Sequence, residues 1–179
     1  GANFLRKNAE FFFIATGYGG RIYRSKNGAT WSLLSTITTS QISDFEVNAA
    51  GNLFISTTGS YVYRSIDDGL SFTQLDADEG LNVSHVYSLS INGSDMYALG
   101  YEAPYKSTDN GASWTSIKTA TLTDNAYVGL IHSIETSLYL VNSVSQKVWL
   151  SGDGGATWSA KTHPLLNFPQ NVSHQSFFA

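Results

Sequence analysis

Carboxylates recur along this chain in a fixed local pattern, and grouped carboxylates can act as general acids and bases or bind a metal ion. The pattern is Ser-x-Asp-x-Gly, with an aromatic residue three positions after the glycine. Its three full copies are Ser65, Asp67, Gly69 and Phe72; Ser107, Asp109, Gly111 and Trp114; and Ser151, Asp153, Gly155 and Trp158. A fourth, shorter copy covers 25–31 and ends at Trp31. A residue that returns with every repeat belongs first to the repeated structure.

The same residue types also build tight turns. An Asp side chain accepts hydrogen bonds from backbone N–H groups two or three residues further on. Glycine adopts the positive φ that closes a hairpin, and the aromatic side chain can bury a large apolar surface. We therefore predict that Asp67, Asp109 and Asp153 are structural and not catalytic. In the shorter copy Asn27 replaces the aspartate, which predicts a tighter and weaker turn.

Histidine and aspartate side chains form a second candidate group. When the first predicted strands of the repeats are aligned, Asp44, His85, His132 and His174 fall at one position. Such strands line the central channel of a propeller, so these side chains could form a ring near one mouth. Histidine with a carboxylate is common in metal and ligand sites, and we leave the metal unspecified. The alternative is a wet, polar channel mouth whose residues the repeats share by descent.

Four short strands surround each copy of the carboxylate pattern. In the third repeat the predicted strands cover 86–91, 96–99, 105–107 and 114–117. The aromatic residues that end the four copies stand 41, 42 and 44 residues apart. A period of about 40–45 residues with four strands per repeat is typical of a β-propeller. We therefore predict an all-β fold with about four four-stranded antiparallel blades, in units covering 1–35, 42–76, 84–118 and 130–161 of one domain or propeller segment.

The end of the chain leaves two arrangements open. Residues 171–175 repeat 82–86 almost letter for letter, so 171–179 resembles another first strand. This segment could add to the first blade and close a four-bladed ring, or it could begin a fifth blade. We favour a partial ring, because four blades is the lower limit for propellers. A partial ring would expose sheet faces and require a partner chain or a second copy.

The motif itself carries a family resemblance. Ser-x-Asp-x-Gly-x-Thr-Trp, as in residues 151–158, resembles the Asp-box or BNR repeat. That repeat occurs in sialidases, in some xyloglucan-cleaving hydrolases, in sortilin-type receptors and in photosystem assembly factors of the Ycf48 kind. The resemblance implies a propeller fold in which the box is a structural turn on the outer edge of a blade, away from any active site.

The arginines argue against a sialidase. That enzyme would need three arginines to grip the substrate carboxylate. The chain contains only four arginines, and Arg24 and Arg64 occupy the same place in successive repeats. Only Arg6 and Arg21 then remain. No two of the other acidic residues form a recognisable glycosidase pair. We therefore expect no catalytic residues and no cofactor.

Composition excludes several further classes of protein. Of the 179 residues, 42% are hydrophobic and 13% charged, which indicates a folded domain. The net charge of −4 argues against nucleic acid as a partner. The absence of cysteine excludes disulfides and thiolate zinc sites, and no apolar run is long enough to span a membrane.

These observations lead to an expectation about function. We expect a non-catalytic recognition or scaffold propeller that is secreted, periplasmic or on the cell surface. It would bind a glycan or a protein through the inter-blade loops at 76–82, 100–104 and 120–127, because loops on a rigid scaffold carry function. The alternatives are a fragment of an Asp-box glycoside hydrolase and an assembly factor resembling Ycf48.

Overall fold

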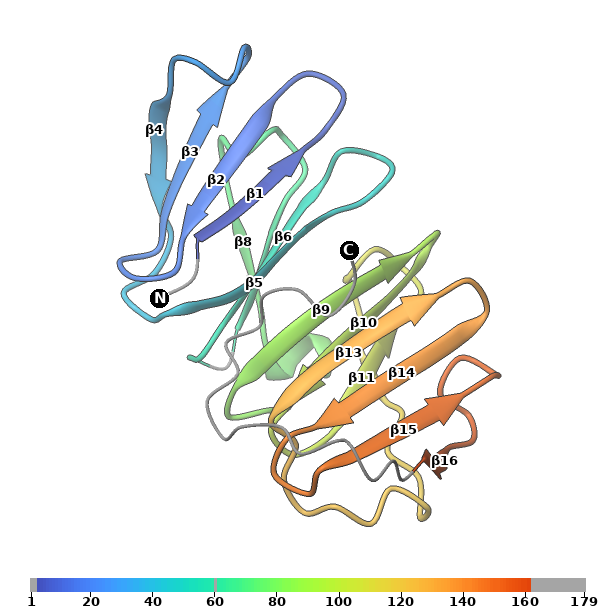
Figure 1. The fold of residues 1–179 in the computed structure, drawn as a ribbon. Helices are drawn as coiled ribbons and strands as arrows, with labels where there is room; N and C mark the ends of the chain where they lie inside the picture. Colours follow the sequence, from blue (N-terminus) through green and yellow to red (C-terminus); the bar gives the residue numbers. More distant parts are fainter. Residues whose placement is uncertain (1–2, 60, 162–179) are drawn as a thin grey trace.

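The computed structural model describes residues 3–59 and 61–161, which form four separate antiparallel sheets of four strands each (Figure 1). The first sheet holds β1 (Asn3–Lys7), β2 (Phe12–Thr16), β3 (Arg21–Ser25) and β4 (Ser32–Thr36). The second holds β5 (Ile42–Val47), β6 (Leu53–Thr57), β7 (Val62–Ser65) and β8 (Thr73–Leu75). The third holds β9 (Val86–Asn92), β10 (Asp95–Gly100), β11 (Pro104–Ser107) and β12 (Thr115–Ser116). The fourth holds β13 (Gly129–Ile134), β14 (Ser137–Asn142), β15 (Lys147–Ser151) and β16 (Ser159–Lys161).

Each sheet is a meander in which strands that follow one another in the chain pair side by side. The prediction of an all-β propeller with four-stranded blades is confirmed, and we call the sheets blades 1 to 4 in chain order. The first strands of successive blades contact one another, β1 with β5, β5 with β9 and β9 with β13. A short 3-10 helix, η1 (Ala77–Glu79), lies in the connection between blades 2 and 3.

The hydrophobic cores lie between the blades. Side chains alternate between the two faces of each strand, so each blade presents one apolar face to the preceding blade and another to the following blade. Blades 1 and 2 enclose a cluster that includes Phe13 and Phe45, and blades 2 and 3 enclose one that includes Phe54 and Met96. Blades 3 and 4 enclose a third that includes Leu99. The described blades thus share three cores.

The turns that carry the Ser-x-Asp-x-Gly pattern, which we call the box turns, have the hydrogen bonds that these residue types predict. The Asp109 carboxylate accepts the backbone N–H of Ser113 at 2.8 Å and the Ser113 hydroxyl at 2.6 Å. The Ser107 hydroxyl donates to Asp109 and accepts the N–H of Gly111. The turns at Asp67 and Asp153 repeat this arrangement. These aspartates are therefore engaged within their own turns.

The shorter first turn works in the same way over fewer residues. Asn27 Oδ1 accepts the backbone N–H groups of Ala29 and Thr30, at 2.9 and 3.0 Å. Its acceptor thus reaches two and three residues ahead, where Asp109 reaches four. Trp31 at its end is only half-buried, whereas Trp114 and Trp158 are buried. The predicted tighter turn is present.

The four blades form an arc. Figure 1 shows blade 1 at one end and blade 4 at the other, with blades 2 and 3 between them. The described strands therefore do not close a ring among themselves. Residues 171–179, for which we considered ring closure or a fifth blade, lie outside the described residues.

Candidate functional site

The first strands carry a row of polar side chains along the inner edge of the arc. One register position of the first strands holds Arg6, Glu46, Ser90 and His132. The second-strand residue opposite each of them pairs in turn with one equivalent position of the third strands, held by Arg24, Arg64, Lys106 and Leu150. The row therefore brings together two charged side chains, a hydroxyl and an imidazole from four strands.

The predicted equivalence of Asp44, His85 and His132 is wrong. Asp44 lies two positions before Glu46, whereas His132 is in register with Glu46. His85 precedes β9, which begins at Val86. The alignment by local similarity was therefore two residues out of register at Asp44. An irregular register in β5 between Ile42 and Asp44 is a further feature that local similarity does not reveal. His174 lies outside the described residues.

The acidic side chains of β5, Asp44 and Glu46, hold neighbouring strands together. The Leu89 N–H donates to Asp44 Oδ2 at 2.9 Å, which joins β9 to β5. Arg6 Nη2 donates to Glu46 Oε1 at 2.9 Å and Arg6 Nε donates to Glu46 Oε2 at 3.3 Å. Burial raises the pKa of Glu46, while Arg6 and the charge of His132 act in the opposite direction. Both oxygens of Glu46 are thus bonded to the guanidinium.

Serines complete the contacts between first strands. Ser43 Oγ donates to the Val86 carbonyl, Ser88 Oγ donates to the Ile131 carbonyl, and Ser90 and Ser133 share a hydrogen bond of 2.8 Å. Sequence reasoning missed this role, although the alternation of Ser88 and Ser90 along one strand was a signal for it. In the part of the chain that the structure describes, no group of three His, Asp or Glu side chains could hold a metal ion.

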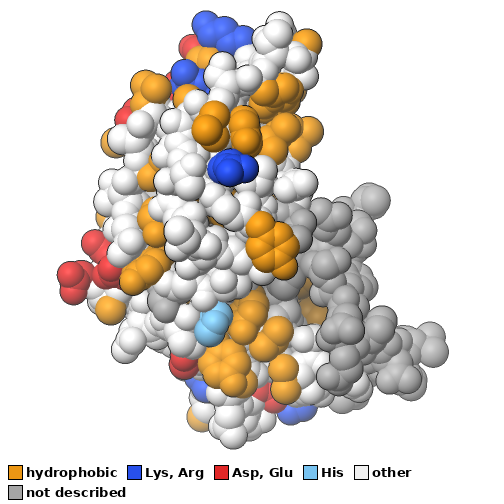
Figure 2. Space-filling view, turned by 90° about the vertical axis from the view of Figure 1, so that its left-hand side faces the viewer, with side chains coloured by type: hydrophobic (Ala, Val, Ile, Leu, Met, Phe, Trp, Pro, Cys, Tyr) orange, Lys and Arg blue, Asp and Glu red, His pale blue; other side chains and the backbone are white. Residues whose placement is uncertain are grey.

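A compact aromatic patch lies where β9 begins, and we call His85, Tyr87 and Tyr101 the mouth patch. The rings of His85 and Tyr87 stack with an interplanar angle of 13° and centroids 6.0 Å apart. The Tyr101 ring lies 6.3 Å from His85 at 60°. Figure 2 shows a histidine side chain among hydrophobic side chains on one face of the molecule. Tyr101 belongs to the predicted binding loop 100–104, so that loop and the start of β9 form one surface.

A carboxylate fixes the backbone beneath the mouth patch. Ser84 Oγ donates to Glu102 Oε1 at 2.6 Å, and the Ser84 N–H donates to Glu102 Oε2 at 3.0 Å. Partial burial acts to raise the pKa of Glu102, but these hydrogen bonds outweigh it and hold the pKa below its ordinary value. The loop that carries Tyr101 is therefore tied to the segment that carries His85.

Ser84, His85 and Glu102 are the residue types of a hydrolase triad, but they lack its order. In a triad the serine hydroxyl donates to histidine and the carboxylate orients the far side of the ring. Here the Ser84 hydroxyl donates to Glu102, and His85 Nδ1 lies 3.3 Å from Ser84 Oγ. The arrangement suits positioning of the aromatic rings and does not suit activation of a nucleophile.

The neighbouring loop at 120–127 is also anchored. Asp124 accepts hydrogen bonds from Asn142, Ser145, Lys147 and the indole of Trp149, at 2.9 to 3.1 Å. Burial acts to raise the pKa of Asp124, but these donors hold it below its ordinary value. Asp124 was not singled out from the sequence, because its donors lie 18 to 25 residues further along the chain.

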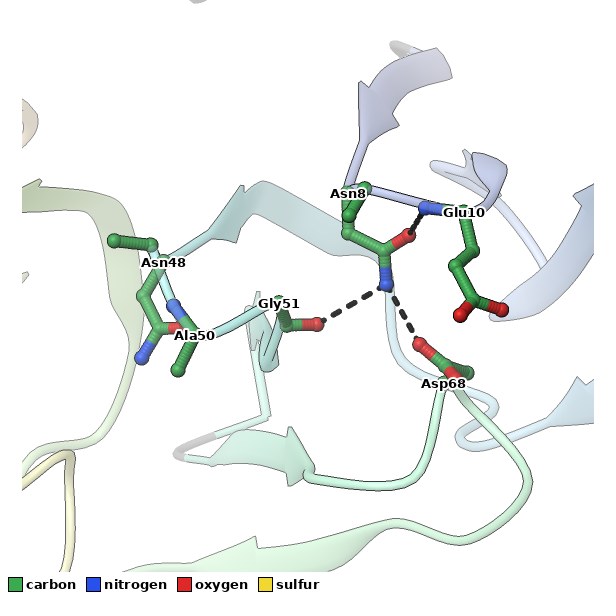
Figure 3. A pocket seen from close by; sticks show the side chains of 8 residues that line it. Asn8, Glu10, Asn48, Ala50, Gly51 and Asp68 are labelled. Carbon is green, nitrogen blue, oxygen red and sulfur yellow. Dashed lines mark hydrogen bonds between the residues drawn. The ribbon is translucent and has the colours of Figure 1, made fainter.

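A polar pocket lies at the opposite ends of the strands, between blades 1 and 2 (Figure 3). It has a volume of about 370 Å³. Asn8 Nδ2 donates to Asp68 Oδ1 at 2.6 Å and to the Gly51 carbonyl at 3.4 Å, and Asn8 Oδ1 accepts the Glu10 N–H. The polar groups here bond one another across the junction, so we assign the pocket a structural role.

The sequence matches the protein family described as the DUF6242 beta propeller domain over residues 38–178. A search of curated protein sequences finds no match. Among the described residues, no helix is long and apolar enough to cross a membrane.

Solved structures with a similar fold include both binding proteins and enzymes. Ycf48 bound to D1 peptide is 14% identical, with a TM-score of 0.65, and the match covers 86% of this chain and 52% of that one. A catalytically inactive virginiamycin B lyase from Staphylococcus aureus with quinupristin is 14% identical, with a TM-score of 0.72 over 93% of this chain and 56% of that one. An ancestral GH74 enzyme is 15% identical, with a TM-score of 0.67 over 90% and 24%.

These likenesses concern the fold alone, because identity is low. The chain spans about half the length of the Ycf48 chain and of the lyase chain that it matches.

Proposed function

The chain belongs to the DUF6242 β-propeller family, and from this premise we propose that it is a non-catalytic recognition propeller that binds a protein segment at the mouth patch. The observation that carries the proposal is the stacking of His85, Tyr87 and Tyr101 on a backbone fixed by Glu102. Aromatic side chains held in place lose little entropy on binding and are typical anchors of protein interfaces. The likeness to Ycf48, which has been solved with a bound peptide, supports a peptide as the ligand.

A glycan is the second ligand that the same surface could take. Tyrosine rings also stack on sugars, and Glu102 and Lys118 lie beside the patch as polar groups. We favour a protein segment because the Tyr101 ring is inclined by 60° to the stacked pair of His85 and Tyr87, and this angled arrangement suits a protruding side chain better than the flat face of a sugar.

A hydrolase is the candidate function from a different class. The likeness to a GH74 enzyme and the raised pKa of Glu46 favour it, since a buried glutamate is a typical general acid. Arg6 argues against it. The guanidinium binds both oxygens of Glu46, so the side chain is turned toward Arg6 and not presented to a substrate. We therefore also expect no hydrolysis of sialosides.

The proposal retains the expectation that the protein acts outside the cytoplasm. Fractionation of the source organism, with an antibody against this chain, tests that part separately from binding.

Selection from a random peptide display library tests the binding function. We expect the wild-type chain to enrich peptides, and a Tyr87→Ala/Tyr101→Ala variant to lose at least tenfold in affinity for them. The matched control is Tyr18→Ala, because Tyr18 is exposed on the equivalent β2–β3 connection of blade 1.

Three outcomes would contradict the proposal. The first is that no peptide is enriched while a glycan array gives specific binding. The second is that the Tyr18→Ala variant loses as much affinity as the double variant. The third is turnover of a polysaccharide that depends on Glu46, which would move the protein to the hydrolase class.

A further inference from the structure

Each described junction between blades buries one cross-strand row of the following blade. Opposite residues in antiparallel strands share a face, so Phe45, Ile55 and Tyr63 form one row on blade 2, directed at blade 1. All three are buried. The equivalent rows of blades 3 and 4 are buried too, at Leu89 and Ala98 and at Ile131 and Leu140.

Blade 1 has the same apolar row with nothing of the described chain against it. Leu5, Ile14, Tyr23 and Leu33 stand opposite one another on β1 to β4. Leu5 is 58% exposed and Leu33 is 54% exposed. The equivalent rows of blades 2, 3 and 4 are buried. This face of blade 1 is therefore as apolar as a face within a junction, but no described blade covers it.

The face of blade 4 that is directed away from blade 3 is also apolar and is not covered by another described blade. Leu130, Val141 and Val148 form its row directed away from blade 3. All three are only half-buried. The equivalent residues of blade 1, Phe4, Ala15 and Ile22, are buried against blade 2. The arc therefore ends in two apolar faces of opposite kind, one that would receive a preceding blade and one that would meet a following blade.

A polar contact repeats beside these cores. Arg24 Nη1 donates to the Asp68 carbonyl and Arg64 Nη1 donates to the Asn110 carbonyl, both at 3.0 Å. In each case a basic residue of one blade reaches the residue that follows the box aspartate in the next blade. That residue has a positive φ, 57° at Asp68 and 62° at Asn110. At the third junction, Lys106 Nζ lies beside Gly154, which also has a positive φ of 67°.

The two ends of the arc lack opposite halves of this contact. In blade 4, Leu150 occupies the position of Arg24, Arg64 and Lys106, as its pairing with Tyr139 shows. In blade 1, the box is one residue shorter, and the residue missing is the acceptor that follows the aspartate. Blade 4 therefore lacks the basic donor, and blade 1 lacks the acceptor that such a donor would reach.

We propose that the outgoing face of blade 4 docks onto the incoming face of blade 1 in a second copy of this chain, in a head-to-tail dimer. If blade 4 meets blade 1, the donor and the acceptor of one contact have been lost together. If each face met an unrelated partner, the two losses would be unconnected. Two such contacts related by a two-fold axis would join the arcs into one ring.

Mass in solution is the first test. Light scattering on the full 179-residue chain should give twice the chain mass. Leu150→Arg places a charge in the contact without an acceptor, so we expect it to weaken dimerisation at least tenfold. The matched control is Leu70→Arg, because Leu70 is 69% exposed on the box turn of blade 2. It should leave the mass unchanged. Circular dichroism of each variant checks that it is folded.

A rescue variant separates this contact from general surface effects. Insertion of an aspartate between Asn27 and Gly28 restores the full box length and supplies the missing acceptor. We expect the insertion to weaken dimerisation alone and to recover most of the lost affinity when combined with Leu150→Arg.

Cross-linking tests the head-to-tail geometry, and the absence of cysteine from the chain makes it simple. Because first strands contact first strands at the described junctions, a Leu5→Cys chain and an Ile134→Cys chain should cross-link through a bis-maleimide only when the two are mixed. Leu5 on β1 is 58% exposed, and Ile134, the last residue of β13, is 37% exposed.

The proposal is overturned if the chain is a monomer up to about 100 µM, a concentration at which even weak specific interfaces form. It is also overturned if Leu150→Arg leaves the dimer as stable as Leu70→Arg does, or if each cysteine variant cross-links on its own. A monomer would mean that neither face docks onto a second copy of this chain.

Discussion

At the residue scale, Asp109 shows how a repeated carboxylate stabilises its turn. Its oxygens accept the hydroxyl and the backbone N–H of Ser113, and the Ser107 hydroxyl donates to it as well. These hydrogen bonds favour the ionised form and lower the pKa of Asp109 from 3.8 to about 2. Hydrogen bonds from Thr157 lower the pKa of Asp153 to about 2 in the same way. The charge of each carboxylate is therefore used within its own turn.

Removal of this side chain should destabilise the protein modestly. We expect Asp109→Ala to lower the free energy of unfolding by about 1 kcal/mol, the typical effect of losing a capping-type interaction at an exposed site. Asn27→Ala should have a smaller effect, because Asn27 is uncharged and its turn is not packed against a preceding blade. Urea denaturation of both variants measures the difference. An Asn27→Ala variant that was the less stable of the two would contradict our interpretation of the turns.

The hydrogen bond from the Ser113 hydroxyl to Asp109 leads to a prediction about pH. Since the folded pKa of Asp109 lies below its ordinary value, the ionised carboxylate stabilises the fold above about pH 4 and loses this effect as the pH falls toward about 2. Ser113→Ala removes the largest cause of the shift, so the pKa of Asp109 should rise toward 3.8. NMR titration of the carboxyl carbons measures it. Asp153 is the internal control and should remain at about 2.

At the element scale, the blades are joined by side chains that leave one sheet and bind the next. Asp44 accepts the Leu89 N–H across two first strands, while Arg64 reaches the Asn110 carbonyl at the other edge of the same junction. The apolar core of the junction lies between these contacts. Polar groups at both ends fix the register of one sheet against another, which nonspecific apolar contact alone does not do.

Arg64 should therefore contribute to stability beyond its own blade. We expect Arg64→Ala to lower the free energy of unfolding by about 1–2 kcal/mol, because a charged donor is lost and the Asn110 carbonyl is left without it. Arg21 is a suitable control, since it is an exposed arginine at the start of a third strand. Arg21→Ala should change stability by less than about 0.5 kcal/mol. Equal losses in thermal or urea unfolding would argue against a specific contact.

At the scale of the whole molecule, stability arises between blades and not within them. Four blades share three described cores, so the blades at the ends bury one face each while the inner blades bury two. Among the described strands, the main contacts between sheets link neighbouring blades, which makes the energetics similar to those of a linear repeat protein. An arc of this kind gains stability from every face that becomes covered.

A matched pair of isoleucines tests this view. Ile14 and Ile55 hold equivalent positions, but only Ile55 is covered by a preceding blade. We expect Ile55→Ala to cost about 2–5 kcal/mol at any protein concentration. Ile14→Ala should cost less at low concentration, and its cost should increase with concentration if a second copy covers the face. Denaturation at two concentrations measures both. A concentration-independent cost for Ile14→Ala would argue against coverage in trans.

The sequence by itself determined the repeated blade, because everything that builds it is local. Strands that pair are neighbours in the chain, and Ser107, Asp109 and Gly111 complete their turn within a few residues. Residue types and a period of about 42 residues were therefore sufficient to predict four-stranded blades and box turns. Only the tertiary structure decided how the blades meet. His132 is in register with Glu46 and not with Asp44, and the mouth patch joins the loop between β10 and β11 to the start of β9. Arg24 reaches an acceptor 44 residues away. Such contacts depend on the distance and angle between sheets, which no local pattern of residues encodes.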